Sequence, residues 1–439
     1  MSSIRFDYKQ ALIDEHELAQ LNQLLLPEIE RVKQARFSGY ETDYASVNLP
    51  FDMRQLQEVQ KVIDAKRKLA PTVLVIVGIG GSNLGTLAVQ QALYGMLYNE
   101  QQPTIKLYYA DTIDSDYIND IVLLAQQALE KDETVLINLV SKSGATTESV
   151  ANFEIFTALL KNYYGDEYHH YVVVTTDAGS KLEEIAQQEK CTTLAIPKKV
   201  GGRYSVLSAV GLFPLGMIGV DLSQLLAGAA SIVDAAINTD MHKNQPAMSA
   251  ALLYAQYQQS VAIHNSFIFS VDLQGIGAWY RQLMAESIGK EQVRSGAHKR
   301  VGIVPTVSIG STDLHSQAQL YLAGPYVTYT TFITVEKNKS DVVIPVDKPM
   351  EKLVANIQGK PLASLMDAIL QGVTAAYTKN KRPFCTITIP EKTDYYIGQL
   401  LQWKMMEIIY LGALLEVNVF DQPQVELYKQ ETRKILAHE

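Results

Sequence analysis

The stretch from Thr134 to Val150, TVLINLVSKSGATTESV, indicates how this chain folds. It opens with an apolar run rich in β-branched residues, which is typical of a buried strand in a parallel sheet. A loop of hydroxyl side chains follows, and from Val150 apolar residues recur at helical spacing. A strand that ends in such a loop before a helix directs backbone N–H groups and the positive end of the helix dipole at one point. We therefore predict a pocket for one phosphate group, to which the hydroxyls can donate hydrogen bonds.

The same loop has a simpler interpretation as a helix cap. Ser and Thr are favoured at helix N-termini because their oxygens accept hydrogen bonds from free backbone N–H groups. Glu148 would then be the second half of a capping box. Taken alone, the loop favours capping, so the phosphate prediction depends on the rest of the chain.

Composition and charge narrow the class of protein. The chain has 439 residues, of which 47% are hydrophobic and 19% charged, and this length suggests about two to three domains. A net charge of −9 argues against a nucleic-acid or anionic-membrane partner, so an anion site has to be a local arrangement. Two cysteines, Cys191 and Cys385, do not make a disulfide framework, and the N-terminus lacks an apolar signal core. We expect a cytoplasmic protein, in which the interrupted apolar stretch 206–220 is buried rather than membrane-spanning.

A second strand–loop–helix unit precedes the first. An apolar strand over 72–77 leads into GIGGSNLG at 78–85 and then a helix over 86–98. The glycines permit a tight turn and close approach of the backbone to a ligand. A dinucleotide fingerprint is the alternative, but Asn83 replaces its third glycine and Asp111 lies further on than the ribose-binding acid should. As a lone motif, the turn fits a tight βα connection without a ligand equally well.

Strands alternate with helical patterns along the first half of the chain, which indicates a parallel sheet with helices on both faces. Further strands are expected over 106–110, 135–140 and 171–175. Because parallel strands end at one edge of the sheet, the loops after Val77 and Val140 should lie together. The hydroxyls expected to converge there on one anion are those of Ser82, Ser141, Ser143 and Thr146.

The second half repeats this alternation and predicts a second α/β region. We expect its strands over 267–271, 327–335 and 383–389, and a helix over 275–289. Gln282 and Glu286 share one face of that helix because they are four residues apart. On spacing alone, Glu286 is more simply a solvated carboxylate paired with Lys290.

Three more stretches carry polar residues whose role the spacing leaves open. Two glycines before Arg203 allow a bend that projects its permanent charge into a cleft, although a surface arginine in a linker fits as well. His315 lies in a turn-forming segment and suits proton shuttling, although a lone loop histidine is more often incidental. Lys429 should fall about two turns into a helix after an Asp-Gln-Pro turn. His169 and His170 are interpreted as surface residues, and no spacing resembles a zinc cluster.

Taken together, six motifs resemble those of the glucose-6-phosphate isomerase family in its compact bacterial form. They occur in the family's order and extend over most of the chain, and GGRYS and the C-terminal block are the specific ones. The motifs are GIGGSNLG at 78–85, SKSGATTE at 141–148, GGRYS at 201–205, AESIGKE at 285–291, STDLHS at 311–316 and FDQPQVELYK at 420–429.

The resemblance implies an α/β fold with two sugar-isomerase (SIS-type) domains, each a doubly wound parallel sheet, and helical N- and C-terminal arms. Residues 1–65 would form an N-terminal helical arm packing with the second domain. Residues 66–200 would be the first domain with the phosphate loops, and 201–415 the second domain with connecting helices. Residues 416–439 would be a C-terminal segment that carries Lys429. The resemblance also implies a homodimer.

The family's reaction is the reversible isomerisation of glucose 6-phosphate and fructose 6-phosphate in glycolysis and gluconeogenesis, through ring opening and a cis-enediol(ate), without metal or cofactor. By resemblance, Glu286 would move the proton between C2 and C1, and Arg203 would stabilise the enediolate. His315, from the neighbouring subunit, would help to open the ring together with Lys429. The residues that would bind the phosphate or orient the sugar are Gly81, Ser82, Ser141, Lys142, Ser143, Thr146, Gln282 and Gln422.

This chemistry is consistent on physical grounds. One base that reaches both carbons suffices for the proton transfer, and a fixed cation lowers the energy of the charged intermediate. The phosphate does not react, so its binding energy can position the sugar. A non-catalytic sugar-phosphate-binding regulatory protein, which would not need Glu286, His315 or Lys429, remains an alternative. So do a related isomerase of broader specificity, including mannose 6-phosphate, and a dinucleotide-dependent oxidoreductase.

The sequence departs from the family pattern at a few positions. Lys198 and Lys199 stand where small or acidic residues are usual, Gln424 where glycine is usual, and Ile288 where many longer relatives have asparagine. None of these positions carries a proposed catalytic group. Gln424 bears on the turn that positions Lys429.

Overall fold

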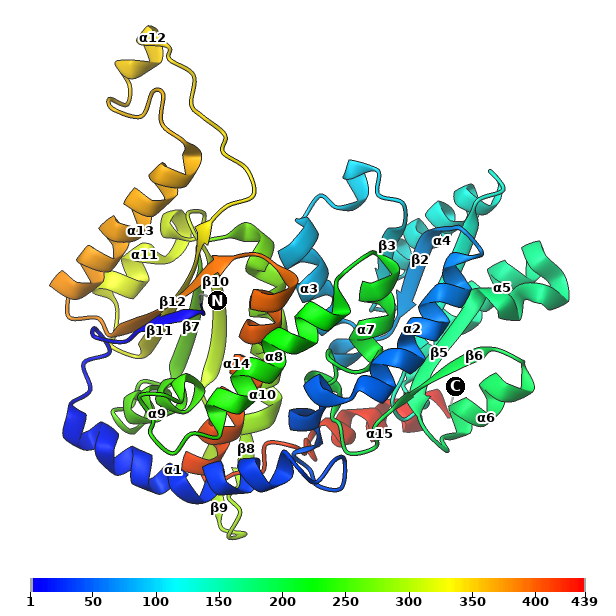
Figure 1. The fold of residues 1–439 in the computed structure, drawn as a ribbon, viewed down its shortest axis with the longest axis horizontal. Helices are drawn as coiled ribbons and strands as arrows, with labels where there is room; N and C mark the ends of the chain where they lie inside the picture. Colours follow the sequence, from blue (N-terminus) through cyan, green and yellow to red (C-terminus); the bar gives the residue numbers. More distant parts are fainter. Residues whose placement is uncertain (1–2, 438–439) are drawn as a thin grey trace.

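The computed structural model describes residues 3–437 and is built on two five-stranded sheets with helices packed around and between them (Figure 1). The first sheet is parallel throughout. Its strands, in spatial order, are β3 (Lys106–Ala110), β2 (Pro71–Val77), β4 (Thr134–Val140), β5 (Val172–Asp177) and β6 (Thr192–Ile196).

Alternate residues of these strands face two different helical layers, since successive side chains of a strand point to opposite faces. Val73, Val75 and Val77 pack in one apolar cluster with α4 (Ser115–Leu129) and α5 (Thr147–Tyr164). Leu74 and Ile76 pack in the other cluster, which contains α3 (Leu84–Tyr94) and α7 (Ala209–Met217). Burial on both faces explains why these strands are continuously apolar.

The second sheet is parallel except for the strand at one edge. Phe6 of β1 (Arg5–Asp7) pairs antiparallel with Ile387, whereas the other ladders are parallel. The order is β1, β12 (Phe384–Glu391), β11 (Thr328–Lys337), β7 (Ile263–Ile268) and β10 (Val304–Ile309). The parallel-sheet prediction is therefore confirmed without exception for the first sheet, and in the second sheet it holds for the four strands other than β1.

The helix that carries Glu286 lies in the interior of the molecule. This helix, α10 (Gln274–Ile288), connects β7 to β10 and packs against α3 and α14 (Asp394–Leu414). The opposite face of the second sheet is covered by α11 (Leu314–Ala323) and α13 (Leu362–Lys379), around an aromatic cluster that includes Phe267 and Phe332. Contact between α10 and α3 joins the two halves of the chain and fixes the base helix beside the first sheet.

The described part of the predicted N-terminal helical arm contains two α-helices. Helix α1 (Glu15–Ala35) packs against α9 and α14, whereas α2 (Met53–Arg67) packs against α7 and β6. The 3-10 segment Ala45–Phe51 separates them and includes Pro50. The domain boundaries at 65, 200 and 415 stay a prediction. The remaining elements are α6 (Lys181–Gln188), α8 (Leu222–Ala236), α9 (Gln245–Gln258), α12 (Lys348–Glu351), α15 (Val425–Leu436), β8 (Lys290–Gln292) and β9 (His298–Val301).

Two segments of the second half lie away from the second sheet (Figure 1). The chain around α12 extends outward, and α15 returns from the second half to lie beside the first sheet (Figure 1). Residues 206–220 are largely buried, with α7 at their centre. Within residues 3–437, none of the helices combines the length and the apolar composition that a membrane span requires.

Candidate active site

Two glycine turns from different halves of the sequence press against each other. A Cβ atom added to Gly81 would lie 2.2 Å from the carbonyl carbon of Gly202 and 2.5 Å from the nitrogen of Arg203. Ser205 donates a hydrogen bond to the Gly81 carbonyl at 3.3 Å. The glycines of GIGGSNLG and GGRYS therefore make possible one backbone contact that a larger residue would prevent.

Arg203 is directed inward from this contact. Its side chain is 1% exposed, and its Nε donates to Ser287 Oγ at 2.8 Å. One terminal nitrogen donates to Gln422 Oε1 at 2.6 Å and to Glu286 Oε2 at 3.2 Å, and the other to the carbonyls of Val419 and Asp421. The linker interpretation is therefore wrong, because this arginine is a buried charge with a protein partner at every donor nitrogen.

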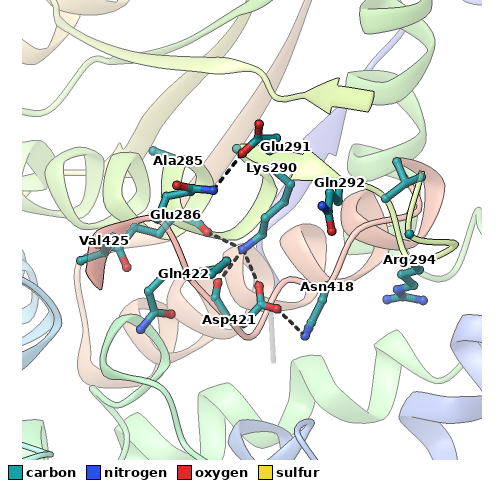
Figure 2. A pocket seen from close by; sticks show the side chains of 15 residues that line it. Ala285, Glu286, Lys290, Glu291, Gln292, Arg294, Asn418, Asp421, Gln422 and Val425 are labelled. Atoms are coloured by element: carbon teal, nitrogen blue, oxygen red, sulfur yellow. Dashed lines mark hydrogen bonds and ion pairs between the residues drawn. The ribbon is translucent and has the colours of Figure 1, made fainter. Parts of the chain in front are cut away.

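Glu286 places its carboxylate between a cation and an amide. Gln282 Nε2 donates to Glu286 Oε1 at 3.0 Å, as their shared helix face predicts. The other carboxylate oxygen meets Arg203, and 32% of the side chain is exposed. Glu286 also lines a cavity of about 710 Å³ (Figure 2). The carboxylate is thus held at both oxygens and open to the cavity.

Lys290 does not form an ion pair with the Glu286 carboxylate, contrary to the simpler interpretation. Its Nζ donates to the main-chain carbonyl of Glu286 at 3.0 Å and to Asp421 Oδ1 at 2.8 Å (Figure 2). Burial lowers the pKa of Lys290, and the hydrogen bond and charge of Asp421 oppose that shift. Lys290 therefore ties the end of α10 to the loop that delivers Gln422.

The hydroxyl-rich loop does not behave as a helix cap. Helix α5 begins at Thr147, and the preceding Thr146 makes no capping hydrogen bond with its side chain. Ser141 is buried, and within the described residues its Oγ has no hydrogen-bond partner. Because a buried hydroxyl without a partner is costly, this one is suited to a ligand.

The glycine turn also joins the hydroxyl-rich loop to the base helix. A Cβ atom on Gly78 would lie 2.8 Å from Ser82 Cβ and 2.9 Å from the carbonyl oxygen of Val140, the last residue of β4. A Cβ atom on Gly80 would lie 2.9 Å from Gln282 Nε2. A continuous path of contacts therefore runs from the end of β4 through residues 78–82 to the face of α10 that bears Glu286.

Lys142 and Lys429 flank the loop in different ways. Lys142 Nζ donates to the carbonyl of Lys198 at 2.7 Å, and burial lowers its pKa. Lys429 lines a second cavity, of about 360 Å³, together with Ser143 and Thr146. It is the fifth residue of α15. The expectation of two turns is wrong, because the helix begins only after Gln424.

Within the described residues of one chain, the His315 side chain does not contact Glu286, Arg203 or Lys429. It is exposed near the start of α11, where its backbone N–H donates to Thr312. Over residues 3–437, no hydrogen bond or ion pair joins its side chain to Glu286, Arg203 or Lys429. Within a single chain, the site contains the predicted base, cation and phosphate loop without this histidine.

A comparison with protein families now identifies the chain. The phosphoglucose isomerase family matches residues 52–439. The chain belongs to the phosphoglucose isomerase family. The glucose-6-phosphate isomerase of Carboxydothermus hydrogenoformans is 32% identical, over 93% of this chain and 92% of its own length. A glucose-6-phosphate isomerase of Thermus thermophilus is 35% identical, over 89% of each chain.

Solved structures agree with this membership. A hypothetical protein from Thermus thermophilus superposes with a TM-score of 0.88 and 33% identity, covering 99% of this chain and all of that one. A glucose-6-phosphate isomerase from Chlamydia trachomatis gives a TM-score of 0.83 over 99% of this chain and 88% of that one. Its identity is 22%, so this second likeness concerns the fold.

Lys198, Lys199 and Gln424, where the sequence is expected to depart from the family pattern, have local partners. Lys199 pairs with Asp43 at 2.7 Å, and the carbonyl of Lys198 accepts from Lys142. Gln424 Nε2 donates to Glu291 Oε2 at 2.9 Å, at the rim of the cavity that contains Glu286. These contacts fasten surface loops around the site without occupying it.

Sequence reasoning missed several residues that hold the site together. Trp279 Nε1 donates to the main-chain carbonyl of Arg203 at 3.2 Å, and Ser287 Oγ accepts from the Nε of Arg203. Asp421 binds Lys290 across 131 residues of sequence. Trp279 and Ser287 could have been suspected to share a helix face with Leu283, since the three recur every four residues, whereas no local signal links Asp421 to Lys290.

Three side chains of types that bind metals lie close together just before β5 of the first sheet. Glu167, His169 and His170 place their ligand atoms within 4.8 Å of one another. The sequence predicts surface histidines and no metal cluster. The group precedes the amino end of β5, whereas the hydroxyl-rich loop follows the carboxyl end of β4, so it lies at the opposite edge of the sheet.

Proposed function

We infer that this chain interconverts glucose 6-phosphate and fructose 6-phosphate, an aldose–ketose isomerisation used in glycolysis and gluconeogenesis. Membership of the phosphoglucose isomerase family over residues 52–439 supports this reaction. So do the glucose-6-phosphate isomerases that match most of the chain. The observation that carries the mechanism is the position of the Glu286 carboxylate, held by Gln282 and Arg203 and open to a cavity.

Glu286 is the proposed base that moves a proton between C2 and C1. Adjacent carbons need only one carboxylate, provided that it reaches both from one side. The Gln282 amide fixes the orientation of one oxygen at 3.0 Å. The exposed part of the side chain leaves room for the sugar.

Arg203 is the proposed stabiliser of the enediolate. Negative charge develops on substrate oxygen in this intermediate, and a fixed cation lowers its energy most when it does not have to reorganise. Hydrogen bonds to Ser287 and to main-chain carbonyls keep the guanidinium fixed beside Glu286. The contact with Gln422 would bring that amide to the substrate hydroxyls.

The phosphate would be bound at the loop after β4, with the turn after β2 beside it. The Ser141 hydroxyl, which has no partner among the described residues, the Thr146 hydroxyl, which makes no capping bond, backbone N–H groups and the α5 N-terminus suit a dianion. Gly81 and Ser82 contribute from the neighbouring turn, and Lys142 and Ser143 belong to the same loop. The binding energy of this unreactive group would hold C1 and C2 against the carboxylate.

A homodimer that shares His315 across its interface is the proposed assembly, in the cytoplasm. His315 is exposed on α11 and is not in contact with its own chain's base, which fits donation to a second copy. The segment around α12 projects from the body, and apolar side chains there are exposed (Figure 1). They are Val342, Val343, Val346, Met350, Leu353 and Val354. Burial against a second copy would remove this apolar surface from water.

A coupled assay from fructose 6-phosphate to glucose 6-phosphate tests the reaction and its base together. Glu286→Gln keeps the shape and the contact with Gln282 but cannot accept the proton, so kcat should fall about 10²–10⁴-fold. Binding of fructose 6-phosphate should persist. Glu336→Gln makes the same chemical change on an exposed carboxylate of β11 and should leave activity unchanged. Full activity of Glu286→Gln would remove Glu286 from its role.

A further inference from the structure

Helix α15 turns two cationic side chains toward the cavity beside the hydroxyl-rich loop. Lys429 and Arg433 are four residues apart, hence on one helix face, and both line the cavity of about 360 Å³. Ser143 and Thr146 line the same cavity from the other side. A group seated there would lie between these hydroxyls and two positive charges, with the carboxylates of Glu148 and Glu426 also in the cavity lining.

The carboxylate of Glu426, on the same helix, forms ion pairs with both cations. Glu426 Oε1 accepts from Lys429 Nζ at 3.1 Å, and Glu426 Oε2 accepts from the Arg433 guanidinium at 3.4 Å. Lys429 lowers the pKa of Glu426, and Arg433 adds to the effect. All three side chains are more than a third exposed, and ion pairs between exposed side chains contribute little net stability. A stronger anion could therefore displace Glu426 at low cost.

The hydroxyl-rich loop has its own lysine, but that ammonium is already in use. Lys142 Nζ donates to the carbonyl of Lys198 and is half-buried there. Compensation of a phosphate dianion by a full positive charge would thus come from the facing helix. A guanidinium suits this task better than an ammonium, because its planar fork can bind two phosphate oxygens at once.

We propose that Arg433 is a further binding residue for the substrate phosphate, and that Glu426 holds its guanidinium until the phosphate replaces it. The exchange swaps one anion for another without moving α15. It rests on the proposed function only in that the phosphate belongs to a sugar. The recognised chemistry is a phosphate dianion between the 143–147 loop and α15.

Titration of the wild-type protein and its variants with inorganic phosphate by calorimetry tests this directly. Arg433→Ala should weaken phosphate binding about tenfold, since a charge-assisted hydrogen bond is lost. The phosphate affinity of Arg433→Lys should lie between those of the wild-type protein and Arg433→Ala. Glu426→Gln should tighten phosphate binding up to about fivefold, because the competing anion is gone. Lys434→Ala is the matched control: Lys434 is adjacent in sequence, pairs with Glu431 at 2.7 Å and does not line the cavity, so phosphate binding should not change.

The same variants are then assayed with fructose 6-phosphate, where the losses should appear mainly in KM. Wild-type phosphate affinity in Arg433→Ala, or an equal loss in Lys434→Ala, would overturn the role of Arg433. Unchanged affinity in Glu426→Gln would overturn the exchange. Phosphate binding that depends on Arg433 without any isomerase turnover would refute the proposed function and keep this proposal. Isomerase turnover together with phosphate binding that does not depend on Arg433 would keep the proposed function and refute the role of Arg433.

Discussion

The Arg203 guanidinium is surrounded by groups that come from two distant parts of the sequence, residues 286–287 and residues 419–422. Ser287 lies 84 residues away and Gln422 lies 219 residues away. Local sequence signals identified most of the participants, though not Ser287: a Gly-Gly-Arg bend, a glutamine and glutamate four residues apart, and an Asp-Gln-Pro turn. Their mutual contacts could not be deduced from spacing, because these depend on how the two halves of the chain pack.

Lys66 provides a prediction at the same scale, outside the site. It is 6% exposed in α2, and burial lowers its pKa to about 8, against 10.5 for the ordinary side chain. Between these two values the unfolded chain holds a proton that the folded protein has lost, so stability should rise with pH across this window. Relative to Lys66→Met, the wild-type protein should gain up to about 1.4 kcal/mol per pH unit.

Urea unfolding of both proteins at about pH 7, 8.5 and 9.5 measures that difference. Comparison with Lys66→Met removes the contributions of titrating groups that do not interact with Lys66; the nearby Cys191 thiol, whose pKa burial raises to about 11, interacts with Lys66 and titrates above this window. If the difference in unfolding free energy between the two proteins does not change with pH, the lowered pKa of a buried Lys66 is contradicted.

At the scale of elements, the contact between the two glycine turns is the junction on which the site depends. Gly81→Ala would place a methyl group against the backbone of Gly202, where no flexible side chain can move away. We expect a loss of about 1–3 kcal/mol in unfolding free energy and a large fall in kcat/KM. Gly372→Ala is the matched control. A Cβ atom there meets nothing within 4 Å, so α13 should gain about 0.5–1 kcal/mol. Equal stability of the two variants would refute the tight contact.

Elements differ in how well the sequence predicts them. Strands β2, β3 and β4 were predicted almost to the residue, because burial on both faces makes them continuously apolar. Strands β6 and β10 were missed: β10 contains Pro305 and is largely exposed or half-buried, and β6 alternates without a long apolar run. The strand expected over 267–271 begins earlier, at Ile263, because polar residues such as His264 and Asn265 are buried in it.

At the scale of the whole molecule, the proposed dimer makes a prediction that a single chain cannot satisfy. Glu286→Gln and His315→Ala homodimers should each have little activity. After unfolding and joint refolding, half of the dimers should be mixed. Each mixed dimer should contain one site with both an intact Glu286 and an intact His315. Activity should then recover to about a quarter of the wild-type value.

Absence of recovery would contradict donation of His315 across the interface. Substitution of Val346 and Leu353 by Asp, which adds charge to the projecting segment, provides a second measurement. It should shift the protein from dimer to monomer in sedimentation and reduce activity in parallel. A monomeric variant with full activity would argue that each chain holds a complete site.

The sequence predicted the overall arrangement of sheets and helices well, because alternating strand and helix patterns constrain a doubly wound fold strongly. The sequence predicted less about how the C-terminal helix α15 comes to lie beside the hydroxyl-rich loop. The position of Lys429 beside Ser143 and Thr146 depends on where α15 begins, and the turn around Gln424 sets that point. Contacts of this kind between the ends of a chain leave no periodic signal.

The central claim is that a phosphate loop and a catalytic carboxylate from different halves of the chain bind one sugar. A crystal structure with fructose 6-phosphate bound to the Glu286→Gln protein tests it most directly. The phosphate should lie at residues 141–146, with C1 and C2 about 3–3.5 Å from the carboxamide at position 286. A phosphate bound elsewhere, or a sugar whose C1 and C2 point away from residue 286, would contradict the account.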